Sequence, residues 1–474
     1  MSLTFFAALF RKFTILIYLF AVITLSAVST SAQATVEPQR EQLLNGLRIL
    51  FWPRLADQDV LIKLRIHSGA AFDIAGKAGQ MAILSDILFP DPATREYFTE
   101  EMSGRLDVAV DYDSLTITMQ GRASEFERMV GILRTALVNT QITPENVARM
   151  RESRIKIIKE TTVSPAMLAD RAIAARLFGD FPYGRPAAGT AESMARVDRA
   201  DLMLAHERFL NSNNATIVVV GNLQKTRVMR ALRQLLGPWR KSEKIIPATF
   251  RQPEPPDART LIINAPADQS AEIRLASRGV ARSNRDYAAA TVLAIVARRR
   301  WEKLAPEMNR TPLFVRNESH VLPGMFVMGA SVDSLLAPKA LNTAREVLKS
   351  LSTTPVPAAE LEQAKAEAIG HHNKELEQPD GIARAWVDID TFGLPGIADQ
   401  VQSFNAVSAS DLQRLASTLF AENRIASVVM GDSRQLKATL EPAIKVELIG
   451  ELEKQPPTKP ETTSGTTIPV KKPD

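Results

Sequence analysis

The segment Gly76-Lys77-Ala78-Gly79 leads directly into Gln80-Met81-Ala82-Ile83-Leu84-Ser85-Asp86-Ile87-Leu88-Phe89. Hydrophobic residues recur in it at three- and four-residue steps, so we expect a helix over 78–89. Upstream, Asn45-Gly46 predicts a turn into a strand over 47–51, and a second strand is expected over 60–66. The segment therefore combines strands and an amphipathic helix within a short length of chain.

The same alternation continues after the helix. Strands are expected over 106–110 and 114–119, followed by a helix over 125–139. Thr143-Pro144-Glu145 then presents an N-cap, an N1 proline and a first-turn acid, which predict the start of a longer helix. Because strands and helices are interleaved while hairpins are frequent, we expect an α+β fold rather than a doubly wound parallel sheet.

The chain contains an internal repeat. Ser193–Asn222 aligns without a gap with Ser403–Asp432 at an offset of 210 residues, and both segments predict a capped helix, a loop and a buried strand that ends at glycine. We therefore expect two homologous domains, each a mainly antiparallel sheet packed against helices. Their expected bounds are 36–241 and 259–452, with a proline-rich linker over 242–258.

Composition excludes several classes of protein. The 474 residues are 45% hydrophobic and 23% charged, which is typical of a globular protein with more than one domain. The absence of cysteine excludes disulfides, cysteine-ligated zinc and thiol catalysis. A net charge of +5, without a basic block interleaved with aromatic residues, gives no indication of nucleic-acid binding. Residues 453–474 are rich in Pro, Thr and Lys, and we expect a disordered tail.

The N-terminus has the order of a secretory signal peptide. Arg11-Lys12 precedes an apolar run over 14–28, and Ala32-Gln33-Ala34 offers small residues for cleavage. We expect residues 1–34 to be removed and the protein to be periplasmic or secreted, without stable membrane insertion. An uncleaved anchor is the alternative, although the run is shorter than a spanning helix requires.

Several motifs in register resemble the insulinase/pitrilysin peptidase family, which includes the mitochondrial processing peptidases and two-domain bacterial members. The similarity covers nearly all of residues 40–450 and implies the two-domain duplication of the processing peptidases. The motifs that carry it are, in order, Asn45-Gly46-Leu47-Arg48-Ile49, Ser68-Gly69, Gly76-Lys77-Ala78-Gly79, Pro182-Tyr183-Gly184-Arg185-Pro186, Gly189-Thr190-Ala191-Glu192-Ser193, Asn213-Asn214-Ala215-Thr216 and Val218-Val219-Val220-Gly221-Asn222.

Active members of this family carry H-x-x-E-H on the helix after Ala-Gly, where two imidazoles bind zinc and the glutamate activates water. Here the same positions are Ala82-Ile83-Leu84-Ser85-Asp86. Ala82 has no donor atom, Ser85 cannot replace the glutamate as a base, and Asp86 is a single carboxylate. The third ligand of the family, a glutamate, aligns best with Ile157, and Glu160 is the possible remnant. We expect no catalytic residue, no zinc and no other cofactor.

Other candidate sites are weaker. The histidines lack metal-ligand spacing, although His371 has Glu367 and Glu375 four residues to either side. The resemblance implies an Arg and a Tyr that bind peptide in the second half; these positions fall near Arg310 and on Phe314, which are the candidate substrate-binding residues. Arg298-Arg299-Arg300 beside Trp301 indicates either a surface for an acidic partner or a solvated helix face.

Three hypotheses follow. The first is a non-catalytic, exported subunit that pairs with a zinc-bearing homologous peptidase and completes a chamber for peptides. The second is an exported scaffold or peptide-binding homodimer that acts alone. The third is an active zinc metallopeptidase with atypical ligands.

Overall fold

The computed structural model describes residues 37–161, 163–265, 270–306, 313–442 and 444–448. All the helices and strands belong to one compact unit that begins at Gln39. The expected signal peptide at 1–34, the expected tail at 453–474 and Arg310 lie outside the described residues.

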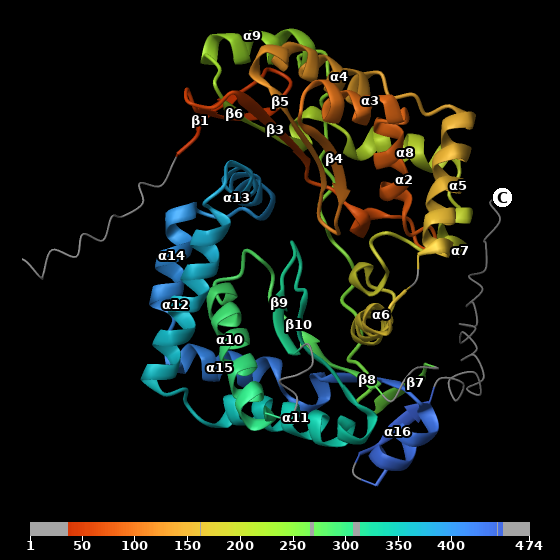
Figure 1. Ribbon diagram of the computed structural model, residues 1–474, viewed down its shortest axis with the longest axis vertical. Coiled ribbons are helices and arrows are strands. Elements are labelled where there is room, and N and C mark those ends of the chain that lie inside the picture. The colour runs from red at the N-terminus through yellow and green to blue at the C-terminus, as the bar shows by residue number, and fades with distance from the viewer. Residues whose placement is uncertain (1–36, 162, 266–269, 307–312, 443, 449–474) are drawn as a thin grey trace, which may run out of the picture. The chain divides into compact units, whose positions relative to one another are not determined.

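The first half of the chain forms a six-stranded sheet in the order β1-β2-β6-β3-β5-β4 (Figure 1). Only β2 and β6 are parallel; the other neighbouring pairs are antiparallel. The strands are β1 (Gln39–Gln42), β2 (Arg48–Pro53), β3 (Asp59–Ile66), β4 (Arg105–Val110), β5 (Leu115–Arg122) and β6 (Ala215–Gly221). The strands predicted over 47–51, 60–66, 106–110 and 114–119 are therefore confirmed.

Several helices of the first half bury their apolar faces on one side of this sheet, whereas the helix over 165–178 packs against the second sheet. The predicted helix over 78–89 is confirmed as α2, and Thr143 caps α5 by accepting a hydrogen bond from the Asn146 N–H. The helices are α2 (Gln80–Leu88), α3 (Pro92–Glu96), α4 (Phe126–Val138), α5 (Pro144–Glu160), α6 (Pro165–Phe178), α7 (Ala191–Ala195), α8 (Arg199–Phe209) and α9 (Lys225–Leu236). One continuous apolar core joins α2, α4, α8 and α9 to the sheet.

The second half forms another six-stranded sheet, in the order β12-β7-β11-β8-β10-β9. The strands are β7 (Thr260–Asn264), β8 (Ser270–Arg278), β9 (Leu313–Glu318), β10 (Met325–Asp333), β11 (Ala426–Gly431) and β12 (Val446–Leu448). The helices are α10 (Tyr287–Leu304), α11 (Ala337–Thr353), α12 (Ala358–Glu375), α13 (Pro379–Phe392), α14 (Ile397–Ala406), α15 (Ala409–Leu419) and α16 (Ser433–Leu440). Residues 237–259, all of them described, contain neither helix nor strand.

The internal repeat is visible in the structure. Helices α8 and α15 lie 210 residues apart, and a capping box opens each of them. The strands that follow them, β6 and β11, occupy the same place in the two sheets. The outermost strands differ, because β1 is antiparallel to β2 whereas β12 is parallel to β7. The α+β prediction with two similar halves is confirmed, while the exact domain bounds stay a prediction.

None of the helices in the described part of the chain is long and apolar enough to cross a membrane.

Candidate functional site

The candidate site inherited from the zinc motif lies on α2, whose first turn is held by a buried carboxylate. Asp73 accepts hydrogen bonds from the N–H groups of Gly79 (2.6 Å) and Met81 (2.9 Å), which the start of a helix leaves without backbone partners. Burial raises the pKa of Asp73 to about 6. Gly79 has a φ of +93°, a conformation that favours glycine. The Ala-Gly entry to α2 is therefore a rigid turn.

A guanidinium occupies the place where the resemblance implies a metal. Arg154 of α5 forms a bidentate ion pair with Asp86: its Nε contacts Oδ2, and its Nη2 lies 2.9 Å from Oδ1. The same Nη2 lies 3.4 Å from the Ser85 hydroxyl, which itself donates to the Ala82 carbonyl at 2.7 Å. Both charged side chains are about three-quarters buried, with 27% and 25% exposed. A side-chain cation thus neutralises the single carboxylate of the motif.

The residues present do not fit zinc. A catalytic zinc needs three protein ligands with free donor atoms, but Ala82 has none, the Ser85 hydroxyl is committed to a carbonyl and the Asp86 carboxylate is committed to Arg154. Among the described residues, no group of three or more His, Asp or Glu side chains lies close enough to hold a metal ion.

The structure does not bring the possible remnant ligand to this site. Glu160 is exposed at the end of α5 and lies 3.9 Å from Lys156 on the same helix. Ile157, the residue aligned with the third ligand, is 58% exposed. The residue of α5 that meets Asp86 is instead Arg154.

The second feature of the site is an exchange of helices between the halves. Helix α13 of the second half lies against β3 and β6 of the first sheet. Its carboxylates meet a basic strand face: Asp380 lies 2.9 Å from Lys63, Asp388 pairs with Arg65, and Asp390 lies 3.2 Å from Arg48. Lys63 and Arg65 are almost fully buried, so each needs an opposite charge nearby.

His67 lies in the same interface as a neutral base. Its Nε2 lies 2.9 Å from Arg48 Nη2 and 3.0 Å from Thr216 Oγ1, while its Nδ1 lies 3.0 Å from Thr391 Oγ1 of α13. Burial, together with the positive charges of Arg48 and Arg65, lowers the pKa of His67 to about 3. The ring therefore connects the two halves without carrying charge near neutral pH.

Helix α6 makes the reciprocal contact, against β8 and β11 of the second sheet. Lys63 and Arg274 occupy equivalent strand positions, because each pairs with the corresponding valine of the repeat, Val218 or Val428. Each cation contacts an aspartate of the helix that comes from the other half: Asp380 for Lys63, and Asp170 for Arg274. A similar ion pair is therefore present in both directions.

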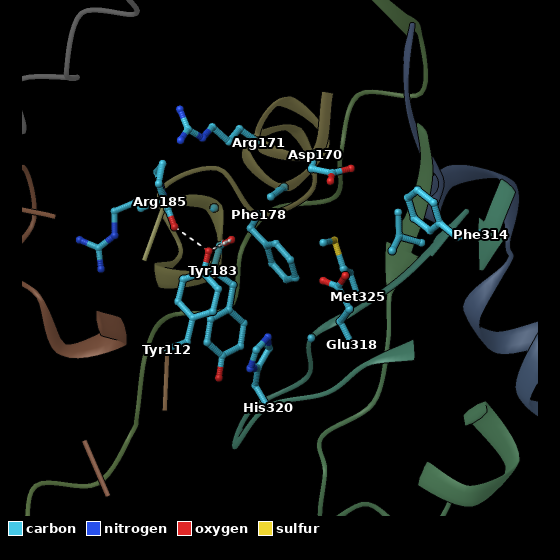
Figure 2. Close-up of a pocket in the computed structure, with 15 residues that line it drawn as sticks. Tyr112, Asp170, Arg171, Phe178, Tyr183, Arg185, Phe314, Glu318, His320 and Met325 are labelled. Carbon is cyan, nitrogen blue, oxygen red and sulfur yellow. Dashed lines mark hydrogen bonds between the residues drawn. The ribbon is translucent and has the colours of Figure 1, made fainter. Parts of the chain in front are cut away.

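A cavity of about 210 Å³ lies beside α6, between the Pro-Tyr-Gly-Arg-Pro loop and the β9–β10 hairpin (Figure 2). Tyr183 donates to buried Asp113 (3.2 Å) and accepts from the Leu322 N–H (3.2 Å), while His320 Nδ1 lies 2.9 Å from the second oxygen of Asp113. Burial raises the pKa of Tyr183. Figure 2 shows the Tyr112, Tyr183 and His320 rings gathered on one wall. The network joins the loop to the hairpin, and the lining residues include no serine or threonine nucleophile.

Phe314, the candidate peptide-binding aromatic, lies on β9 and lines this cavity. Its ring is flanked by two guanidinium groups, those of Arg316 (3.9 Å) and Arg274 (5.1 Å). Arg310, the other candidate substrate-binding residue, is outside the described residues, so the structure does not place the pair.

The arginine cluster meets an acidic surface of its own chain. Arg298 and Arg299 pair with Glu367 at 2.7 and 2.8 Å, and Arg300 pairs with Glu360 at 2.9 Å, so the cluster joins α10 to α12. Trp301 is fully buried. His371 lies 3.6 Å from Glu367, which is already committed to the two arginines. These residues act as an internal ion-pair network.

Sequence reasoning missed Arg154, Asp113 and His320. A signal for Arg154 existed: it follows the buried Val147 by seven residues, or two helical turns, and therefore lies on the inward face of α5. No local signal indicated that Asp113 and His320, 207 residues apart, would meet.

Comparison with known sequences shows similarity to peptidase M16 proteins over part of the chain. The model of the peptidase M16 inactive domain matches residues 196–298. Uncharacterized zinc proteases of Mycobacterium tuberculosis and Rickettsia bellii are 25% and 20% identical over 212 and 208 residues, which cover 43% of this chain in each case. The matches span 48% and 50% of these relatives, so this chain aligns with about half the length of the curated proteins it matches.

Solved structures show the same fold. A protease from Helicobacter pylori superimposes with a TM-score of 0.75 at 16% identity, covering 84% of this chain and 100% of that one. A peptidase M16 inactive domain from Pseudomonas fluorescens gives 0.74 at 17% identity, covering 84% and 98%. The periplasmic protease PqqL from Escherichia coli gives 0.72 at 16% identity, covering 93% and 52%. The chain therefore has the two-domain M16 peptidase fold, as its motifs predicted.

Proposed function

We propose that this protein is a non-catalytic M16-type subunit that pairs with a zinc-bearing homologous peptidase and helps to enclose its peptide substrates. The observation that carries the proposal is the ion pair between Arg154 and Asp86. It places a permanent cation in contact with the only carboxylate that the motif retains on α2. A guanidinium cannot activate water for attack, because it stays protonated at every physiological pH.

The complete two-sheet architecture supports a role for the scaffold itself. Loss of the metal ligands has not been accompanied by loss of the fold: both sheets, both exchanged helices and the joint at Tyr183 are intact. A chain that retains a peptidase scaffold without its metal ligands can still supply a wall of a chamber or stabilise an active partner. The match to the M16 inactive domain model agrees with this role.

Export is part of the proposal. The sequence of residues 1–34 has the order of a signal peptide, and one structural neighbour, PqqL, is named as a periplasmic protease. We therefore place the subunit and its partner outside the cytoplasm. The total mass of the mature protein, measured after expression with its own N-terminus, tests cleavage after Ala34.

The decisive experiment is co-expression with an H-x-x-E-H homologue from the same genome. Light scattering on the purified mixture should show a heteromeric complex, and cleavage of a peptide mixture should be at least severalfold faster than with the homologue alone. A partner whose motif glutamate is changed to glutamine is the matched control, because it should form the complex without cleaving peptide. Absence of a complex together with unchanged peptidase activity would refute the proposal.

The same preparation distinguishes the alternatives. A stable homodimer that ignores the homologue supports the stand-alone scaffold. Stoichiometric zinc that survives dialysis, with cleavage by this chain alone that Asp86→Ala abolishes, supports an active peptidase with atypical ligands.

A further inference from the structure

A second cavity, of about 1010 Å³, lies entirely within the second half, far along the chain from the α2 motif. It is formed by the last turns of α11, the turn before β11 and the segments that precede β7 and β12. Its lining residues are Ala258, Arg259, Arg345, Leu348, Lys349, Ser352, Phe420, Glu422, Asn423, Ile425, Ile444 and Lys445.

The cavity is basic. Four of its side chains are cationic, whereas Glu422 is the one acid among the lining residues. Arg259 is committed to Asp257 and Glu447, at 2.7 and 3.2 Å. In the described part of the chain, however, Arg345 has no ion pair within 4 Å: Glu422 acts on it only through its more distant charge, and its hydrogen bonds go to two neutral hydroxyls. Burial lowers the pKa of Arg345 from its ordinary value, although an arginine stays charged.

The two hydroxyls that hold Arg345 are built into the sheet. Arg345 Nη2 donates to Thr260 Oγ1 and to Ser427 Oγ, both at 3.2 Å, and the two hydroxyl oxygens lie 2.8 Å apart. Thr260 and Ser427 are fully buried partners across the parallel pair β7–β11. A buried hydroxyl costs free energy unless it is hydrogen-bonded. The hydrogen bonds therefore stabilise both the two buried hydroxyls and the guanidinium of Arg345.

The first half provides an internal control. The equivalent parallel pair, β2–β6, places Ile49 opposite Ile217, and both side chains are fully buried and apolar. An apolar pair therefore satisfies the fold at this position of the sheet. Replacing it with two hydroxyls and a charged partner adds nothing that packing requires, but it fixes a guanidinium at the edge of a cavity.

The remaining wall is apolar, formed by Leu348, Phe420, Ile425 and Ile444. Leu348 and Phe420 are largely buried, while Lys349 and Lys445 are exposed at the rim. A ligand that suits this surface carries a negative group for Arg345 and the two lysines, together with an apolar body for the opposite wall.

We propose that this cavity binds an organic carboxylate that bears an apolar group, with Arg345 as the anion-binding residue and Thr260 and Ser427 as its positioning residues. A guanidinium is well suited to this task, because its parallel N–H groups match the two oxygens of a carboxylate. Such a group occurs at the C-terminus of a peptide that ends in an apolar residue, and in a short fatty acid. The proposal goes beyond the proposed function and does not depend on it.

The test is isothermal titration calorimetry of the full mature chain with N-acetyl-leucine and with octanoate, against N-acetyl-leucinamide as the uncharged match. We expect at least one of the two acids to bind at a single site, and we expect the amide to bind at least about 10-fold more weakly than that acid. Tighter binding of N-acetyl-leucine identifies a peptide terminus as the source, and tighter binding of octanoate identifies a fatty acid. Equal affinity for acid and amide would overturn the proposal. So would the absence of binding by either acid at a ligand concentration of about 10 mM.

Variants localise the site. Arg345→Gln should weaken binding of the acid about 10-fold or more and leave binding of the amide unchanged. Arg434→Gln, which removes the same charge from an exposed position on α16, should leave both unchanged. If Arg345→Gln does not fold, the exposed double variant Lys349→Gln/Lys445→Gln decides, because it lowers the positive charge of the rim without touching the buried hydroxyls. Unchanged affinity in the folded variants contradicts the assignment.

Discussion

Replacing Arg154 with methionine tests whether the guanidinium holds Asp86 in place of a metal. Methionine keeps most of the side-chain length but removes the charge. Exposed ion pairs contribute about 0.2–1 kcal/mol, whereas breaking a fully buried pair costs about 3–5 kcal/mol. Since Arg154 and Asp86 are 27% and 25% exposed and the contact is bidentate, we expect Arg154→Met to lower the free energy of unfolding by about 1.5–2.5 kcal/mol.

A double-mutant cycle in urea separates the ion pair from the loss of packing. Asp86→Ala combined with Arg154→Met should cost about 1–2 kcal/mol less than the sum of the single changes, because the double variant leaves no unpaired charge. The control is the exposed pair of Lys156 with Glu160 on the same helix, where Lys156→Met should cost less than about 0.5 kcal/mol. If the effects of Arg154→Met and Asp86→Ala on the free energy of unfolding are additive to within about 0.5 kcal/mol, the ion pair between these residues does not stabilise the fold.

Three further predictions concern the contacts between the halves. In the folded state His67 is neutral, with a pKa of about 3, whereas in the unfolded state it takes up a proton below its ordinary pKa of 6.5, so stability should fall as the pH drops from 6.5 towards 3. In urea titrations, His67→Gln should remove about 2 kcal/mol of this loss of stability between pH 7 and 4.5. An unchanged pH profile would contradict the assignment. Asp388→Asn leaves the buried Arg65 without its opposite charge and should cost about 1–3 kcal/mol, with faster amide exchange in α13; slower or equal exchange would count against it. Tyr183→Phe removes the hydroxyl that joins Asp113 to the β9–β10 hairpin and should lower the free energy of unfolding in urea by about 1–2 kcal/mol. An unchanged free energy of unfolding would mean that water replaces the hydroxyl.

Local patterns predicted most of the first half. Alternation and apolar spacing located β2, β3, β4, β5, α2 and α4, and Thr143 marked the start of α5 to the residue. These features depend on neighbours within a few positions of the chain, so a single sequence contains them. The repeat likewise predicted the second sheet, because α15 and β11 repeat α8 and β6 at a constant offset.

Long-range pairing was the part that the sequence did not predict. The resemblance predicted which ligand positions lack a donor, but not that Arg154 would pair with Asp86, because Arg154 is one of several basic residues on a highly charged helix. The arginine cluster at 298–300 had two interpretations, and only the position of α12 shows that Glu360 and Glu367 satisfy it. In both cases the partner lies 60 or more residues away, and charge alone does not specify which opposite charge is met.

Both exchanged helices combine apolar contacts with ion pairs, but the number of ion pairs to the opposite sheet is larger for α13, and this difference predicts which contact opens first. Helix α6 contributes Ile173, Leu177 and Phe178 to an apolar cluster with the second sheet, and burial of apolar surface is not weakened by salt. Helix α13 also packs Trp386 against Trp52 of β2, but its Asp380, Asp388 and Asp390 pair with cations of the first sheet, remain partly exposed and are therefore screened at high ionic strength. Raising sodium chloride from about 0.1 M to about 1 M shortens the screening length from about 10 to about 3 Å, so amide exchange should accelerate in 379–392 before it does in 165–178. Equal acceleration in both helices, or earlier exchange in α6, would show that charge does not hold α13 on the first sheet.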